Sequence, residues 1–254
     1  MHIELIPIKT ETMKDRFDLF EIIVQTIERN KEQILDNDII VISSKFVAMS
    51  QGSVVELNTV KPSERALKMA EKFNMNPKLV ELVLQESDYI FNGIEGFILA
   101  VKDGVMAPNA GIDKSNIQQG FVILHPKDAF NVAQTLRKKF LANAGKKVGI
   151  VITDSRLMPL RIGTVGIAVG VAGFEPVEDL RGKKDLFGNI LKVTLKATAD
   201  SIATAANMIM GESDESIPLV IVRNFNVRMS DEIFSWRDLA IPSDQCIYVR
   251  GLRE

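Results

Sequence analysis

Three carboxylates that lie far apart in the sequence stand at the ends of predicted elements. Asp154 directly follows an apolar run, Asp113 lies in a polar turn, and Glu212 follows an alanine-rich segment. Side chains at the ends of buried strands project into crevices while the strand holds them rigid. If the three converge, they form a site for a hard cation. The competing interpretation is that each is an ordinary turn or cap residue.

The cysteine and histidine content narrows the choice of metal. The chain has one cysteine, Cys246, and two histidines, His2 and His125. Neither a Cys-rich centre nor a His-based zinc centre can be built from these residues. Any metal would therefore have oxygen ligands, which favours Mg²⁺ or Mn²⁺. No nucleophile–base pair is apparent, and His125, just before a proline, is interpreted as structural.

Two further polar segments could bind ligands. Residues 108–116 combine Asn, Gly, Asp and Asn in one turn and so offer oxygen ligands and amide donors together; an Asx-turn is the alternative. Residues 181–185 place Arg181 and Lys183 beside a glycine, which suits phosphate or carboxylate recognition; a basic hairpin tip is the alternative. The chain has no Walker A motif, and its glycines do not form a dinucleotide fingerprint.

The composition excludes several classes of protein. Of 254 residues, 46% are hydrophobic and 25% charged, and the formal net charge is −2, so a basic nucleic-acid footprint is absent. No apolar stretch approaches the length of a membrane span. The N-terminus lacks the pattern of a signal peptide, and with one thiol a cytoplasmic location is expected.

Apolar periodicity predicts alternating short strands and amphipathic helices. No linker or repeat divides the chain, so we predict a single domain over residues 1–254, of α+β class, with mixed sheets, flanking helices and two lobes. The pattern is weakest from residue 229 onward. An Asp-Gly pair at 103–104 predicts a type I′ hairpin turn. The predicted strands are 3–8, 39–43, 97–102, 105–106, 148–153, 165–172, 191–196 and 219–223, and the predicted helices are 18–30, 63–70, 77–86, 126–142 and 198–210.

These segments, in this order, resemble the coenzyme F420-0:L-glutamate ligase family over about residues 1–228. The resemblance is carried by these segments: Pro62-Ser63-Glu64-Arg65-Ala66, Asn109-Ala110-Gly111-Ile112-Asp113-Lys114-Ser115-Asn116, Ile150-Val151-Ile152-Thr153-Asp154-Ser155, Gly182-Lys183-Lys184-Asp185-Leu186-Phe187-Gly188, Ala199-Asp200-Ser201-Ile202-Ala203, Met210-Gly211-Glu212 and Ile217-Pro218.

The resemblance implies a fold, an activity and a set of site residues. It implies an intertwined homodimer that joins the amine of L-glutamate to a carboxylate of the deazaflavin coenzyme precursor, using GTP and Mg²⁺ or Mn²⁺. An acyl phosphate is the simplest route to the amide. The implied metal ligands are Asp113, Asp154, Ser155 and Glu212, and Asn116 would contact the nucleotide. We add Ser44, Lys45, Arg161 and Arg181 as cofactor-binding residues, and Lys183, Asp113 and Asp154 as catalytic residues.

Three segments depart from the family pattern. Residues 8–13 replace a Gly-Leu-Pro or Gly-Ile-Pro loop, Ala48-Met49 replaces a Ser-Lys pair, and Leu157-Met158 replaces Gly-Arg, although Pro159 and Arg161 are retained. Three hypotheses remain open: a ligase for the deazaflavin precursor, a related ligase for another carboxylate, and a non-catalytic protein that binds nucleotide or deazaflavin.

Overall fold

A five-stranded mixed sheet forms the centre of the molecule. The computed structural model describes residues 2–13 and 15–251. The strand order is β1-β12-β2-β8-β9, and β2 and β8 run parallel while the other neighbours are antiparallel. The strands are β1 (Glu4–Ile8), β2 (Ile39–Ser43), β8 (Gly149–Leu157), β9 (Thr164–Ala172) and β12 (Leu219–Arg223).

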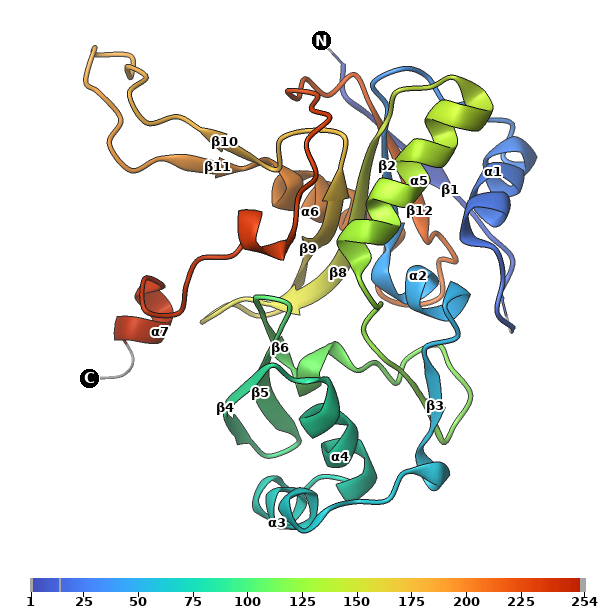
Figure 1. Cartoon of the computed structure of the whole chain (residues 1–254), viewed down its shortest axis with the longest axis vertical. Coiled ribbons are helices and arrows are strands. Elements are labelled where there is room, and N and C mark those ends of the chain that lie inside the picture. Colours follow the sequence, from blue (N-terminus) through green and yellow to red (C-terminus); the bar gives the residue numbers. More distant parts are fainter. Residues whose placement is uncertain (1, 14, 252–254) are drawn as a thin grey trace.

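Helices cover both faces of this sheet, which explains why its central strands are continuous apolar runs (Figure 1). One face packs against α1 (Leu19–Arg29), α2 (Ser44–Ser50) and α5 (Ala129–Ala144), and the other against α6 (Thr198–Met210). Side chains at the N-caps fix where several helices begin. Asp18, Ser43 and Ser63 each accept a hydrogen bond from the backbone N–H three residues later.

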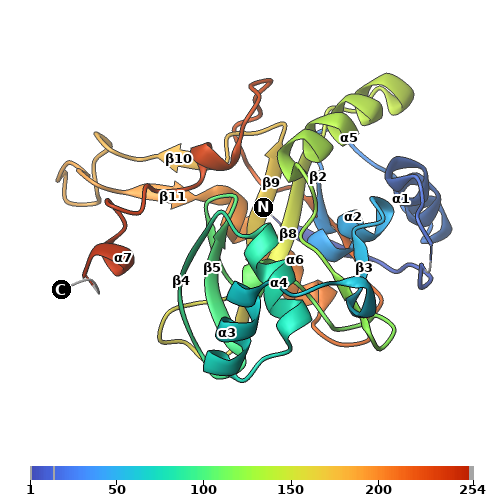
Figure 2. The ribbon, with the colours of Figure 1, turned by 60° about the horizontal axis from the view of Figure 1, so that its bottom comes forward.

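A second, smaller lobe has its own apolar core. Helices α3 and α4 pack there against a three-stranded antiparallel sheet, β4-β5-β6 (Figure 2). The turn between β5 and β6 has positive φ at both Asp103 (48°) and Gly104 (74°), as a type I′ turn requires, so this prediction is confirmed. The elements are α3 (Glu64–Phe73), α4 (Pro77–Glu86), β4 (Tyr89–Ile94), β5 (Phe97–Lys102) and β6 (Val105–Pro108).

Short elements connect the two lobes. A two-stranded antiparallel ribbon pairs β3 with β7, and a left-handed Ala110 lies in the turn η2 that follows β6. This turn packs in the small lobe. The chain that follows it, from Asp113 onward, runs toward the main sheet. These elements are β3 (Val54–Glu56), η1 (Leu57–Thr59), η2 (Asn109–Gly111) and β7 (Phe121–Ile123).

An arm projects from the main body between β9 and α6 (Figure 1). Its strands β10 (Val177–Asp179) and β11 (Leu195–Ala197) form an antiparallel pair, and an isolated antiparallel bridge joins Lys184 to Ile190. The predicted strand 191–196 is therefore wrong for most of its length: this two-stranded ribbon joins no larger sheet, and apolar residues that read as strand are solvent-exposed. Val193 is 84% exposed and Leu195 53%.

The chain beyond β12 returns to the small lobe. Ser230 N–H donates to the Gly173 carbonyl at 2.9 Å, and the ring of Trp236 then lies against the β5–β6 turn. This C-terminal segment thus joins the main sheet to the small lobe in a region where the sequence pattern is weakest. It contains η3 (Trp236–Asp238) and α7 (Ile247–Gly251).

Gly104→Ala is expected to destabilise the protein because the β5–β6 turn has no room for a methyl group. A Cβ at Gly104 would lie 2.5 Å from Trp236 Cε3, and its φ is +74°. Left-handed backbone costs about 1–2 kcal/mol and overpacking about 1–3 kcal/mol more. The matched control is Gly96→Ala, which has φ of +80° but meets nothing within 4 Å. Denaturant unfolding should show the larger loss for Gly104→Ala; equal losses would contradict close packing of Trp236.

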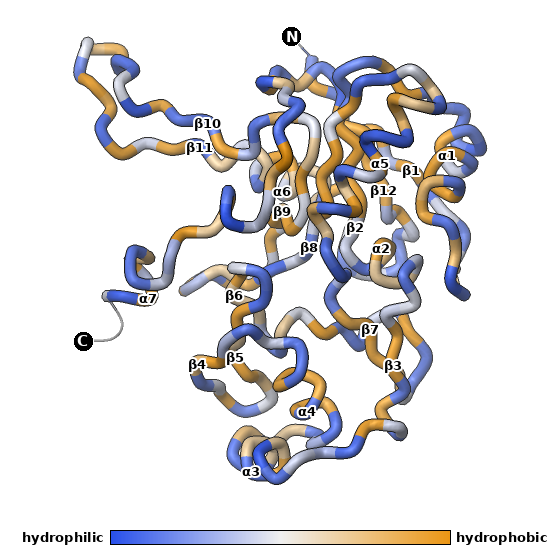
Figure 3. The backbone as a smooth tube through the Cα atoms, in the orientation of Figure 1, coloured by the Kyte–Doolittle hydropathy of each residue, from blue (hydrophilic) through white to orange (hydrophobic). Residues whose placement is uncertain are grey.

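The fold is of α+β class, as predicted. Apolar residues concentrate in the central strands and in the inner faces of the helices (Figure 3). Across residues 2–13 and 15–251, no helix has both the length and the apolar character needed to cross a bilayer. That residues 1–254 act as one domain stays a prediction.

Candidate active site

Parallel pairing of β2 and β8 brings the first two site residues together. Ser43, the last residue of β2, lies opposite Thr153 in the register, and β8 extends beyond this point to Leu157 rather than ending at residue 153 as predicted. The chain then turns into α2 after β2, while β8 continues. Ser44 consequently faces Asp154, and its Oγ donates a hydrogen bond to Asp154 Oδ1 at 2.8 Å.

Asp154 is held on both of its carboxylate oxygens. Oδ1 also accepts from the backbone N–H of Ser155 at 3.1 Å, and Oδ2 forms an ion pair with Nη1 of Arg156. His125 Nδ1 lies 3.8 Å from the same Oδ2. The Asp154 side chain is 19% exposed, so one part of the carboxylate remains open to solvent while the rest is fixed.

Two buried residues beside Asp154 have no role in the sequence-based site. Arg156 was not selected from the sequence at all; a usable signal is its position two residues after Asp154, because alternate residues of a strand share a face. His125 was interpreted as structural, which stays a prediction. Burial lowers the pKa of His125, and the nearby Asp154 charge offsets only part of this effect, which favours the neutral imidazole.

Glu212 joins the site through Ser155. Ser155 Oγ donates to Glu212 Oε1 at 2.7 Å, and Asn207 Nδ2 and Thr164 Oγ1 each lie 3.1 Å from the same oxygen. The loop that carries Glu212 begins at Gly211, which has φ of +74° and ends α6. The last turn of α6 and the start of β9 therefore position this carboxylate.

Asp113 joins the site through Lys45. Lys45 Nζ lies 2.7 Å from Asp113 Oδ2 and 2.8 Å from Ser115 Oγ. Burial raises the pKa of Asp113, but hydrogen bonds from Lys45 and from the Ser115 N–H outweigh it and hold that pKa below its ordinary value. Asn116, in a left-handed conformation, donates from Nδ2 to the Ser213 carbonyl at 2.7 Å.

Four segments that are distant in sequence therefore meet where the two lobes join. Residues 44–45, 113–116, 154–155 and 212–213 are linked to one another by these hydrogen bonds and ion pairs. The segments meet, and the convergence of the three carboxylates on one cation stays a prediction. The altered loop 8–13 contacts the chain three residues beyond Ser213, where the Thr10 N–H donates to the Ser216 carbonyl.

The donor set suits a hard cation by chemical type, since it consists of carboxylate and hydroxyl oxygens. Within the described part of the chain, however, no three acidic, histidine or cysteine side chains form a group that could hold a metal ion. Asp113 is paired with Lys45, Asp154 with Arg156, and Glu212 with Ser155. The assignment of Asp113, Asp154, Ser155 and Glu212 as metal ligands stays a prediction.

Three predicted residues lie outside this cluster. Arg181 and Lys183 are on the arm, where they pair with Asp179 and Glu178. Arg161 is exposed in the turn between β8 and β9, and in residues 2–13 and 15–251 its side chain has no hydrogen-bond or ion-pair partner. Within one chain, the structure does not bring these cations to Asp154, so their roles stay predictions.

A half-buried acid, Asp200, lies near His125. Asp200, in the first turn of α6, lines with His125 and Trp236 a cavity of about 80 Å³. Its Oδ1 accepts the Ala168 N–H at 2.9 Å, but burial dominates and raises its pKa above 3.8. Ionised Asp200 is therefore a cost to the folded state at neutral pH.

Asp200→Asn is expected to raise the free energy of unfolding at pH 7. Below pH 3.8 the folded and unfolded wild-type chains both carry protonated Asp200; as pH rises through the raised folded pKa, the unfolded state ionises first and stability is lost. Asparagine removes this loss and can still accept the Ala168 N–H. Thermal unfolding at pH 4 and pH 7 should show a gain for the variant that is larger at pH 7. A larger gain at pH 4 would contradict the sign.

Comparisons with known proteins agree on one family. The sequence model of the F420-0:Gamma-glutamyl ligase family matches residues 7–224. A coenzyme F420:L-glutamate ligase of Methanocaldococcus jannaschii is 40% identical over 85% of this chain and 86% of its own length. Those of Methanothermobacter thermautotrophicus and Archaeoglobus fulgidus are 37% and 36% identical, over 82% and 89% of this chain and 83% and 90% of their own lengths.

Proposed function

Because this chain belongs to the F420-0:gamma-glutamyl ligase family and is therefore a ligase, we propose that it joins L-glutamate to a carboxylate of the coenzyme F420 precursor. The observation that carries the proposal is the convergence of residues 44–45, 113–116, 154–155 and 212–213 at one point between the lobes. The resemblance drawn from the sequence rests on three of these four segments.

An amide bond forms only when the acceptor carboxylate is activated. In the proposed reaction, the γ-phosphoryl group of GTP passes to a carboxylate oxygen and GDP leaves. The glutamate nitrogen then attacks the acyl phosphate carbon, phosphate leaves with the bridging oxygen, and a proton is released. Phosphoryl transfer depends on positioning and charge neutralisation rather than on a protein nucleophile.

Each cluster residue has a task in the proposal. Asp154, Asp113, Glu212 and the Ser155 hydroxyl would hold Mg²⁺ or Mn²⁺, which would neutralise phosphate charge. Lys45 is the ammonium nearest to Asp113 and would also bind phosphate oxygens, with Ser44 as a hydroxyl donor beside it. Asn116 orients the 212–213 loop through the Ser213 carbonyl and would contact the nucleotide.

A homodimer is part of the proposal, and the arm supports it. Leu186, Phe187 and Val193 are 101%, 91% and 84% exposed on a ribbon that has no core of its own. Apolar side chains concentrated on a projecting ribbon favour contact with a second copy. Such a contact would also give Arg181 and Lys183 a site to act on, because neither reaches Asp154 within its own chain. We take the reaction to be cytoplasmic, in keeping with the single thiol.

A second candidate is a ligase for a different carboxylate. The observations that favour it are Met49 on α2 and the exposed Leu157 and Met158 at the end of β8, where the family pattern has Lys and Gly-Arg. These changes lie on elements that adjoin the cluster but leave its carboxylates in place. The third candidate is a protein that binds its ligand without catalysis. It gives no function to the three carboxyl groups at the site.

Mass spectrometry of reaction mixtures distinguishes the candidates. The purified protein is incubated with L-glutamate, GTP, Mn²⁺ and either the deazaflavin precursor or one of a panel of other carboxylates. We expect the precursor to gain one or more glutamyl units. Glutamylation of another carboxylate alone would favour the second candidate. Calorimetric binding of deazaflavin without metal, together with no glutamylated product, would favour the third.

A further inference from the structure

Arg156 is a buried cation whose one acidic partner is Asp154. It lies on β8, its side chain is 6% exposed, and its Nη1 pairs with Asp154 Oδ2 and donates to the Ser155 carbonyl at 3.2 Å. In the described part of the chain, its Nε and Nη2 are buried without any hydrogen-bond partner. Burying a guanidinium whose N–H groups have no acceptor lowers the stability of the folded state. The contact with Asp154 is thus the main compensation for this cost.

The same guanidinium also packs on the turn that carries Asp113. A Cβ built on Gly111 would lie 3.0 Å from Arg156 Nη2 and 3.5 Å from Nη1. Gly111 has φ of +73° and precedes Asp113 by two residues. One side chain therefore touches Asp154 from the main sheet and the backbone beside Asp113 from the small lobe.

We propose that Arg156 is a positioning residue, which fixes the Asp154 carboxylate and sets its spacing from the turn of Asp113 so that both serve one divalent cation. Its guanidinium holds Oδ2 from the buried side, so Oδ1 stays directed toward Ser44 and the open part of the site. The glycine at 111 lets the turn approach the guanidinium closely. This inference rests on the proposed function, because it takes the cation as given.

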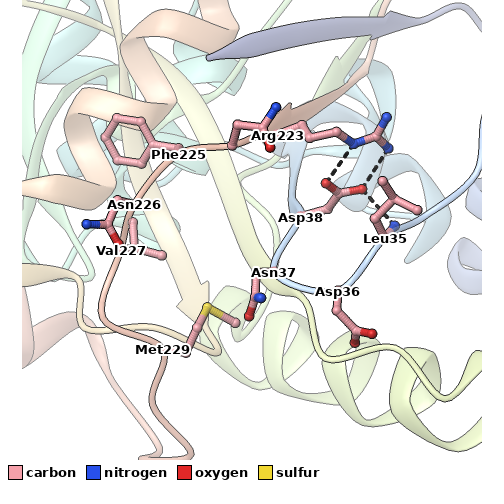
Figure 4. A pocket seen from close by; sticks show the side chains of 10 residues that line it. Leu35, Asp36, Asn37, Asp38, Arg223, Phe225, Asn226, Val227 and Met229 are labelled. Atoms are coloured by element: carbon pink, nitrogen blue, oxygen red, sulfur yellow. Dashed lines mark hydrogen bonds and ion pairs between the residues drawn. The ribbon is translucent and has the colours of Figure 1, made fainter. Parts of the chain in front are cut away.

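A second buried Asp–Arg pair in this chain shows what a purely structural pair looks like. Asp38 and Arg223 lie at the opposite end of the main sheet, beside a surface pocket (Figure 4). Arg223 binds both Asp38 oxygens, at 2.9 and 2.8 Å, and also the Gln33 carbonyl. Its donors are spread over several acceptors. In the described part of the chain, Arg156 uses Nη1 alone, toward Asp154 and the Ser155 carbonyl, and its unpartnered Nη2 lies beside Gly111.

Titration with Mn²⁺, followed by the electron paramagnetic resonance signal of the free ion, tests the proposal without requiring turnover. Arg156→Met should weaken Mn²⁺ binding about 10–100-fold, the usual effect of removing a group that orients a metal ligand. Arg156→Lys keeps the charge but not the planar fork, and should recover part of the affinity. The matched control is Arg223→Met, which should lower the melting temperature but leave Mn²⁺ affinity unchanged.

Unchanged or tighter Mn²⁺ binding by folded Arg156→Met would overturn the proposal. If Arg156→Met does not fold, Gly111→Ala is the second variant: its methyl group pushes on the guanidinium, so weaker Mn²⁺ binding supports the proposal and unchanged binding overturns it. A wild-type chain that binds no Mn²⁺ would overturn the cation assignment of the proposed function, and this inference with it. If the wild type binds Mn²⁺ and the variants Arg156→Met and Gly111→Ala bind it equally well, only this inference is overturned.

Discussion

Asp154→Asn is expected to abolish metal-dependent ligation; the chain should still fold, but with lower stability, because the buried Arg156 loses its acidic partner. The amide oxygen can still accept the hydrogen bonds from Ser44 and the Ser155 N–H, and the side-chain volume is unchanged. The charge that would bind the cation is lost. Metal ions supply several kcal/mol of charge stabilisation, and each 1.36 kcal/mol is tenfold in rate, so kcat/KM should fall about 10³-fold or more.

The matched control for Asp154→Asn is Ser44→Ala. That change removes one hydrogen bond to Asp154 Oδ1 but keeps the carboxylate, and a typical hydrogen bond contributes about 0.5–1.5 kcal/mol, so kcat/KM should fall no more than about tenfold. Circular dichroism should match wild type for both variants. Metal-dependent turnover retained by folded Asp154→Asn would remove Asp154 from the cation site.

Phe187→Glu is expected to convert a dimer into a monomer. Phe187 is 91% exposed on the arm, so within one chain the substitution disturbs no packing. In a symmetric dimer the same contact occurs twice, and each buried Phe contributes about 1.5–3 kcal/mol, before the cost of burying a carboxylate is added. Light scattering should give the mass of two chains for wild type and of one, 28.2 kDa, for the variant.

Lys184→Gln serves as the control for the arm, because it changes the charge of the same ribbon without adding or removing an apolar side chain. It should remain dimeric. If light scattering gives the same mass for wild type, Phe187→Glu and Lys184→Gln, the arm has no part in association. The proposal for the arm then fails.

The elements were predictable wherever one local rule decided the structure. The apolar runs at 39–43 and 219–223 became central strands because helices cover both faces, and Asp103-Gly104 became the expected turn. The helix predicted over 126–142 begins only at Ala129, because left-handed Asp128 caps it after Pro126. Helix α2, which begins directly after β2 with Ser43 as its N-cap, was not predicted.

The site was predictable in its parts but not in its pairing. Glu212 follows the end of α6, as the sequence pattern indicates, whereas Asp154 lies inside β8, which extends to Leu157 and does not end at residue 153 as predicted. Their approach depends on parallel pairing of β2 with β8 and on the end of α6, and neither follows from local pattern. The burial of Arg156 was hidden for the same reason: an arginine near the end of a strand normally points to solvent, and only the small lobe packed against β8 encloses it.

The most direct measurement of the central claim is nucleotide turnover by the purified protein, followed as GDP and inorganic phosphate, with each component omitted in turn. The account predicts release of GDP and phosphate together with glutamylated precursor, and only when precursor, L-glutamate, GTP and Mg²⁺ or Mn²⁺ are all present. Absence of turnover with GTP or any other nucleotide, for a folded protein given both the precursor and glutamate, would contradict it.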